Sequence, residues 1–192
     1  GIDKLSKSAP YLFGLVALFA YVAAQTGVNS FFINYVTEAS STITNQQAAL
    51  MLSFGGMGFF LVGRLLGTWL MNYLSAPRLL LICAVGAMMC MIGVICGGTV
   101  GLISLIVTYL FESIMFPTIF ALALQGLSTS ATKRGSSYLI MTVVGGAIAP
   151  MLMGYIGENN MAIGFIIPLV CYLVVATYAK KIKKTYEQES IC

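Results

Sequence analysis

The sequence predicts an all-α membrane protein of six transmembrane helices. Of its 192 residues, 59% are hydrophobic and only 8% are charged, and the mean hydropathy is +0.93. Soluble domains are about 25% charged and about 45–50% apolar, so water is not the main solvent of this chain. A helix needs about 20 apolar residues to cross a bilayer, which leaves room here for about six crossings. We therefore expect one membrane domain over residues 1–192.

Six apolar stretches carry this prediction. Each is long enough to span the membrane, and each lacks the alternation of apolar and polar residues that is typical of barrel strands. Because lipid offers no hydrogen-bond partners to backbone amides, such stretches form helices. In chain order the predicted spans are Pro10–Thr37, Gln46–Tyr73, Pro77–Gly97, Gly101–Gln125, Gly135–Ile156 and Met161–Ala179.

The boundaries of the spans follow from polar residues, glycine and proline. The first span is too long for the core of a signal peptide, so it is interpreted as a true spanning helix. The connections between spans fall at residues 38–45, 74–76, 98–100, 126–134 and 157–160. Three prolines, Pro117, Pro150 and Pro168, lie inside predicted spans. Membrane helices tolerate such prolines as bends, so we expect some of these helices to be bent.

Basic residues predict the orientation of the bundle. The connections that contain Glu38 and Glu158 hold no Lys or Arg. The positive-inside rule therefore places both termini in the cytoplasm, with residues 180–192 as a basic cytoplasmic tail. Five or seven helices would scatter the basic residues over both sides of the membrane. These residues are Lys4, Lys7, Arg64, Arg78, Lys133, Arg134, Lys180, Lys181, Lys183 and Lys184.

Several function classes are disfavoured by composition. The basic residues form short clusters instead of a continuous basic face, so no nucleic-acid partner is expected. The chain has no histidine, and its five cysteines show no CxxC spacing, so neither a metal site nor a cofactor is predicted. An enzyme is not predicted either, because the sequence contains no HExxH string and no nucleophile paired with a histidine base.

Glu112 is an acidic residue deep inside the fourth predicted span. It lies about 11 residues, or ~16 Å, into this span, close to the centre of a hydrocarbon core that is about 30 Å thick. A charged side chain at that depth costs about 2.5 kcal/mol or more, so Glu112 must face a cavity, find a partner or stay protonated. Two interpretations stay open: a proton carrier, or a hydrogen-bond partner of another helix.

A polar stripe marks the first predicted span. Gln25 and Asn29 are four residues apart on one helical face, with Tyr21 one turn earlier. Amides and phenols offer donors and acceptors to a neutral sugar, and an aromatic ring stacks on its CH face. Tyr109 lies three residues before Glu112 and would complete such a site. Hydrogen bonds between helices explain the same residues without a ligand.

Several strings resemble one known family, and they occur in the same order. They are YVAAQTG at 21–27, GRLLGTWL at 63–70, PTIF at 117–120 and GSS at 135–137, together with the long stretch 111–154. The family is that of the fucose/galactose/glucose proton symporters, within the major facilitator superfamily. The resemblance runs over essentially the whole chain.

The resemblance implies a twelve-helix transporter made of two six-helix halves, of which this chain matches the second. Such a half consists of two inverted three-helix repeats. The missing N-terminal half would be the partner, and the location would be a bacterial inner membrane. The chain begins at Gly1 without an initiator Met, so we expect it to be cut from a longer protein. The first and fourth spans would line the central cavity, which favours Gln25, Asn29, Tyr109 and Glu112 as cavity residues.

The resemblance also implies gating near the cytoplasmic connections. Asn72 stands where the loop signature of the superfamily usually has an acidic residue. Proton coupling in the family is associated largely with carboxylates of the N-terminal half, so Glu112 is favoured more as cavity lining than as proton carrier. The gating candidates are Gly63, Arg64, Gly67, Arg78, Lys133 and Arg134.

The predicted function is secondary active transport. A small neutral sugar and a proton bind near the midplane, and this half rocks against its partner to expose them to either face. The alternative is a self-contained six-helix membrane protein, either a small transporter or a structural subunit, that acts as a homodimer.

Overall fold

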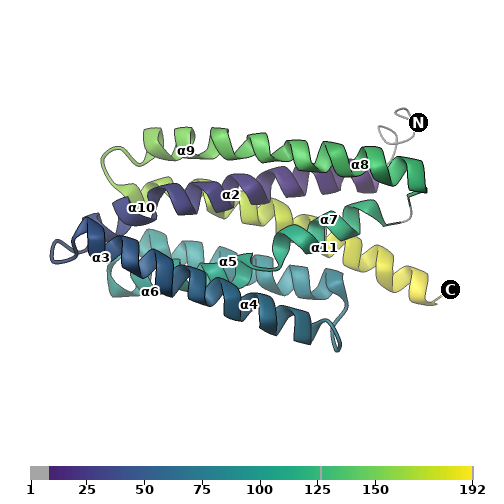
Figure 1. Cartoon of the computed structure of the whole chain (residues 1–192), viewed down its shortest axis with the longest axis horizontal. Coiled ribbons are helices and arrows are strands. Elements are labelled where there is room, and N and C mark those ends of the chain that lie inside the picture. Colours follow the sequence, from purple (N-terminus) through teal and green to yellow (C-terminus); the bar gives the residue numbers. More distant parts are fainter. Residues whose placement is uncertain (1–8, 126, 192) are drawn as a thin grey trace.

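The computed structural model describes residues 9–125 and 127–191, and all regular secondary structure within them is helical. Among these residues, six helical rods are long and apolar enough to cross a membrane. They run up and down in an elongated bundle (Figure 1). We refer to them as helices one to six, and the prediction of six spans is confirmed. Their bounds are Ala9–Ala39, Asn45–Leu70, Ala76–Cys96, Gly98–Leu124, Thr129–Ile156 and Met161–Gln188.

Four of the six helices consist of shorter pieces. Helices one and three are the continuous α2 (Ala9–Ala39) and α5 (Ala76–Cys96). Helix two joins α3 (Asn45–Leu50), the π-helical turn η1 (Met51–Gly56) and α4 (Met57–Leu70). Helix four joins α6 (Gly98–Glu112) and α7 (Met115–Leu124). Helix five joins α8 (Thr129–Met141), the 3-10 turn η2 (Thr142–Val144) and α9 (Gly145–Ile156). Helix six joins α10 (Met161–Gly164) and α11 (Ile166–Ile191).

The start of helix five differs from the prediction. It begins at Thr129 instead of Gly135, because the Ser128 hydroxyl caps it and accepts a hydrogen bond from the Ala131 amide at 3.3 Å. Ser at an N-cap satisfies one of the amides that the first turn leaves unpaired. Lys133 and Arg134 therefore lie in the first turns of α8 and not in the connection, where they were expected.

The end of helix six also differs from the prediction. It does not stop at Ala179, because α11 continues as a polar helix to Ile191. Lys, Glu and Gln, which dominate this segment, are good helix formers in water. The predicted basic tail is thus helical as far as the structure describes it. Lys4 and Lys7, which also entered the orientation argument, lie outside the described residues.

Helix one is the centre of the bundle. In its most apolar window, 61% of the residues are buried, against 11% for helix two. It packs against helices four, five and six, whereas helix two packs mainly against helix four. The exposed apolar side chains of helix two therefore face lipid or another part of a larger protein.

Three tyrosines of helix one fasten it to its neighbours. The Tyr11 hydroxyl donates to the carbonyl of Gly135 in helix five at 2.8 Å. Tyr21 donates to the carbonyl of Glu112 in helix four at 2.9 Å, and Tyr35 donates to the carbonyl of Val94 in helix three at 2.6 Å. All three side chains are buried. A buried phenol needs such a partner, so these bonds satisfy the hydroxyls and also tie helices together.

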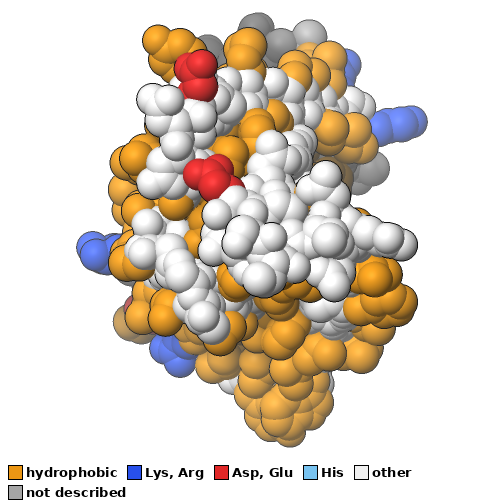
Figure 2. Space-filling view, turned by 90° about the vertical axis from the view of Figure 1, so that its left-hand side faces the viewer, with side chains coloured by type: hydrophobic (Ala, Val, Ile, Leu, Met, Phe, Trp, Pro, Cys, Tyr) orange, Lys and Arg blue, Asp and Glu red, His pale blue; other side chains and the backbone are white. Residues whose placement is uncertain are grey.

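The end of the bundle opposite to Arg78 carries two acidic residues, Glu38 and Glu158. Figure 2 looks onto the end that carries the connections after helices one, three and five, and acidic side chains lie near the centre and toward the upper edge of this face, while basic ones appear at its margins. Glu38 lies in the last turn of α2, and Glu158 lies in the connection after helix five. Glu38 also holds the start of helix six, because its carboxylate accepts a hydrogen bond from the Met161 amide at 3.2 Å.

Candidate functional site

Polar side chains of helices one, four and six meet inside the bundle around Glu112. This residue ends α6 and is fully buried. The hydroxyl of Tyr172 in helix six donates to Glu112 Oε1. Glu112 Oε2 has no hydrogen-bond partner within the described part of the chain. Glu112 therefore has a partner on another helix and one oxygen without a hydrogen-bond partner among the described residues.

Tyr172 is a residue of this cluster that the sequence analysis missed. It lies in the apolar sixth span, which contains two tyrosines, Tyr172 and Tyr178, and nothing in the local sequence marks either as the partner of Glu112. An intramembrane acid is expected to find a polar partner in the bundle interior. That expectation identifies a class of residue, while the packing of helix six against helices one and three selects Tyr172.

A second polar contact joins helices one and four. The Tyr109 hydroxyl donates to Asn29 Oδ1 at 2.6 Å. Asn29 is half-buried, and so is Gln25, one turn earlier on the same helix. No hydrogen bond of the Gln25 side chain is found among the described residues. The contact orients the Asn29 amide and leaves its NH2 group, together with the Gln25 amide, for a ligand.

The structure divides the five predicted binding residues into two groups. Tyr21 and Tyr109 are each 1% exposed and Glu112 is 0% exposed, so these three are enclosed by the chain itself. Only the two amides, Gln25 and Asn29, reach the surface of the bundle. In this conformation, the amides of Gln25 and Asn29 are therefore the members of the group that a molecule outside the bundle can contact.

Helix four breaks next to Glu112. Pro117 has no N–H, so the carbonyl of Ser113 cannot receive its usual hydrogen bond within the helix. Arg64 Nε donates to this carbonyl at 3.0 Å, and Tyr21 donates to the preceding one, that of Glu112. A hydrogen bond with a charged group contributes about 1.5–3 kcal/mol. The bend predicted from Pro117 is thus present, and both carbonyls at the break have partners from neighbouring helices.

The residues that were expected at the cytoplasmic connections do not form one group. Gly63, Arg64 and Gly67 lie inside α4, where a side chain at Gly63 would collide with the Leu110 carbonyl and Ser113. A side chain at Gly67 would meet Ile114. These glycines therefore serve close packing of helices two and four. The predicted second span, Gln46–Tyr73, already contained these three residues, and the structure places them inside helix two, which continues to Leu70.

The remaining gating candidates are exposed. Arg78 lies in the first turn of α5 and faces Glu187 of α11, with 3.8 Å between its Nη2 and the carboxylate. Exposed ion pairs of this kind contribute about 0–1 kcal/mol. Lys133 and Arg134 are exposed on α8. The sequence did not indicate the contact between Arg78 and Glu187, which depends on how far helix six extends.

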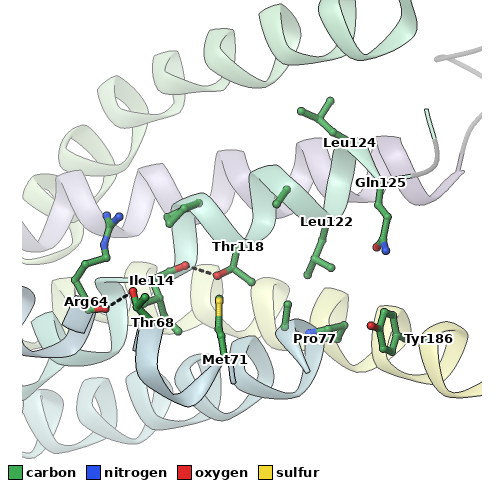
Figure 3. Close-up of a pocket in the computed structure, with 13 residues that line it drawn as sticks. Arg64, Thr68, Met71, Pro77, Ile114, Thr118, Leu122, Leu124, Gln125 and Tyr186 are labelled. Carbon is green, nitrogen blue, oxygen red and sulfur yellow. Dashed lines mark hydrogen bonds between the residues drawn. The ribbon is translucent and has the colours of Figure 1, made fainter. Parts of the chain in front are cut away.

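A cavity of about 560 Å³ lies beside α7 (Figure 3). The hydroxyls of Thr68 and Thr118 point to carbonyls of their own helices, with bonds of 2.8 Å to Arg64 and 2.6 Å to Ile114. Since these groups are satisfied and most other lining side chains are apolar, the cavity is not a ready polar site. Four helices form it, so no single stretch of sequence predicts it. Its lining includes Arg64, Thr68, Met71, Pro77, Ile114, Pro117, Thr118, Ala121, Leu122, Gln125 and Tyr186.

Known proteins resemble this chain over most of its length. No protein-family model matches it. It is 36% identical over 182 residues to the L-fucose-proton symporter of Escherichia coli (strain K12), which covers 93% of this chain and 41% of that protein. It is 34% identical to the glucose/galactose transporter of Brucella abortus, over 86% of this chain and 40% of that protein.

A crystal structure of the Escherichia coli fucose:proton symporter matches with a TM-score of 0.88 and 34% identity, over 94% of this chain and 44% of that one. A solved structure of the same major facilitator transporter in the outward conformation matches equally well. This chain belongs to the major facilitator superfamily. It matches the C-terminal half of the major facilitator fold. It spans about two fifths of the length of these relatives.

The predicted fold class, an all-α half of a major facilitator fold, is therefore confirmed. Its relatives are transporters, and six of its helices are long and apolar enough to cross a membrane among the residues described. This major facilitator chain is thus an integral multi-pass membrane protein.

Proposed function

We propose that this chain is the C-terminal half of a proton-coupled sugar symporter. Its substrate would be a small neutral sugar of the fucose, galactose and glucose class, which are the sugars named for its relatives. The observation that carries the proposal is the hydrogen bond from Tyr109 to Asn29. It orients an amide at the surface of helix one, beside Gln25, where neutral hydroxyls find both donors and acceptors.

The rest of the protein would supply the opposing wall of the site. Sugar sites of such transporters lie near the bilayer midplane between two repeats, and rocking of one half against the other exposes them alternately. The amides of Gln25 and Asn29 would face this interface, because they are the accessible members of the polar cluster. Glu112, enclosed behind them, would exchange the proton that moves with the sugar.

Uptake of labelled fucose, galactose and glucose tests this function. The full-length transporter is placed in vesicles, and uptake is measured with and without an imposed pH gradient, acidic outside. We expect uptake of at least one sugar and stimulation by the gradient. Uptake without stimulation would contradict proton coupling, and no uptake of any of the three sugars would contradict the proposed substrate class.

The two amides are expected to contribute directly to sugar affinity. Gln25→Ala and Asn29→Ala should each weaken sugar binding roughly 2- to 10-fold, which is the effect of losing one neutral hydrogen bond of about 0.5–1.5 kcal/mol. Binding is measured by isothermal titration calorimetry on the purified full-length protein. Asn34→Ala is the matched control, because Asn34 is an exposed amide on another face of the same helix. Unchanged affinity in both variants would assign Gln25 and Asn29 to packing.

We also propose that both termini lie in the cytoplasm, in a bacterial inner membrane. Single cysteines at Lys133 and Glu158, in a background without other cysteines, test this orientation with a thiol reagent that does not cross membranes. Both side chains are exposed, and Glu158 is preferred to Glu38 because Glu38 holds the start of helix six. We expect the cysteine at 158 to react from outside and the one at 133 only after the cells are opened. Reaction of both from the same side would contradict the six-span topology.

A further inference from the structure

Helix four is interrupted inside the bundle, between Glu112 and Met115. Figure 1 shows α7 leaving the line of α6 at this point. Pro117 removes the N–H that would bond to the Ser113 carbonyl, and Ser113 is only 1% exposed. Water is therefore a poor partner for the carbonyls at the break, and protein side chains must take that role.

Two helices each supply one of these partners. Arg64 of helix two donates from Nε to the Ser113 carbonyl at 3.0 Å. Tyr21 of helix one donates to the Glu112 carbonyl at 2.9 Å. Adjacent carbonyls are thus held from two directions, which restrains movement at the junction of α6 and α7.

Each partner also contacts an aromatic ring, although Tyr21 is buried and Arg64 is exposed. Tyr21 is enclosed, and its ring lies 6.4 Å from that of Phe116. The Arg64 guanidinium lies over the Phe60 ring at 5.8 Å. Next to Arg64, Gly63 allows helix two to approach the Leu110 carbonyl of helix four. The break is therefore held by oriented side chains.

The two sides of the break have different surroundings. On the α6 side, Glu112 is bonded to Tyr172 of helix six, which anchors the end of α6. On the α7 side, Pro117 and Thr118 line the cavity of about 560 Å³ that separates them from Thr68 of helix two (Figure 3). Segment α7 has room to move, whereas the end of α6 does not.

We infer that Tyr21 and Arg64 are positioning residues that fasten the break in helix four and restrain α7, which pivots at Ser113 while α6 stays fixed to helix six. The inference rests on the proposed transport function, in which α7 would open and close the inner end of the path. Hinges of this kind are a few residues at the ends of helical elements.

The test follows a buried thiol. Ile119→Cys places a sulfur on α7 at a position that is 0% exposed and does not line the cavity, so it reacts with maleimide only when α7 moves. The full-length transporter, without other cysteines, is labelled in vesicles in the absence of sugar. Tyr21→Phe and Arg64→Gln each remove one fastening and should accelerate labelling at least about threefold, the effect expected from losing one hydrogen bond. Pro117→Ala restores an N–H to close the helix and should slow labelling by a similar factor.

Matched controls separate a hinge from general loosening. Tyr35→Phe removes an equivalent buried hydroxyl from the same helix, bonded to Val94 at 2.6 Å, and Pro150→Ala removes another proline inside a helix, in α9. Both should leave the labelling rate unchanged. Equal rates in all variants would overturn the inference, and so would equal acceleration by Tyr21→Phe and Tyr35→Phe. These rates are measured without sugar, so a failure of sugar uptake would overturn the proposed function and leave this result standing.

Discussion

Replacing Glu112 with Gln should abolish most of the stimulation of sugar uptake by a pH gradient. Gln has nearly the same shape and its carbonyl oxygen can still accept from Tyr172, whose hydroxyl donates to Glu112 Oε1, so packing is preserved. It cannot release a proton. The gradient effect should therefore fall at least about fivefold, the lower end of typical coupling between two ligands, and the dependence of uptake on pH should flatten.

Exchange of sugar across vesicles at equilibrium separates loss of coupling from loss of binding. It needs no net proton movement, so Glu112→Gln should retain it. Glu158→Gln is the matched control, because Glu158 is an exposed acid at one end of the bundle. A full gradient effect in Glu112→Gln would place proton coupling outside this half and leave Glu112 only its structural bond to helix six.

Replacing Gly63 with Ala should destabilise the bundle strongly for a change of one methyl group. The added carbon would collide with the Leu110 carbonyl oxygen and with Ser113 Oγ. A backbone carbonyl cannot rotate away as a flexible side chain can, so helices two and four must separate. Overpacking of this kind costs about 1–3 kcal/mol, and the shift also strains the bond from Arg64 to Ser113. Thermal unfolding of the purified protein in detergent measures the loss.

Gly58 offers a control on the same helix. A side chain at Gly58 would meet nothing within 4 Å. Ala has a higher helix propensity than Gly by about 1 kcal/mol, so Gly58→Ala should leave the unfolding temperature unchanged or raise it. If Gly63→Ala and Gly58→Ala behave alike, the close packing of helices two and four contributes little to stability.

The sequence predicted the helical bundle well because the features that define a membrane span are properties of short stretches of chain. The length of each apolar stretch and the polar breaks between them required six helices, and Glu38 and Glu158 did appear at the end opposite to the exposed Arg78. Boundaries were less certain. Ser128 caps helix five before its apolar run begins, and the Lys-rich segment continues helix six beyond its apolar run. Capping and helix propensity extend these two helices into polar sequence, which hydropathy does not identify as helical.

The candidate site was predicted only in part. Helical periodicity grouped Gln25 with Asn29 and Tyr109 with Glu112, and the structure brings both groups together. Periodicity could not separate accessible amides from enclosed residues, because that depends on which neighbouring helix covers each face. Arg64 shows most clearly what periodicity cannot predict. Its partner is the carbonyl of Ser113, 49 positions away, which lacks a hydrogen bond within its own helix because of Pro117.

By itself, the sequence determined the solvent of the protein and the number of membrane-length helices among the described residues, because the free energy of placing each residue in lipid or water depends on that residue and its close neighbours. Tertiary structure alone decided which polar groups meet: Tyr172 with Glu112, Tyr109 with Asn29, and Arg64 with the break in helix four. In lipid, a polar side chain that cannot bond to its own helix must find its partner on another one, and only the packing of the helices selects that partner.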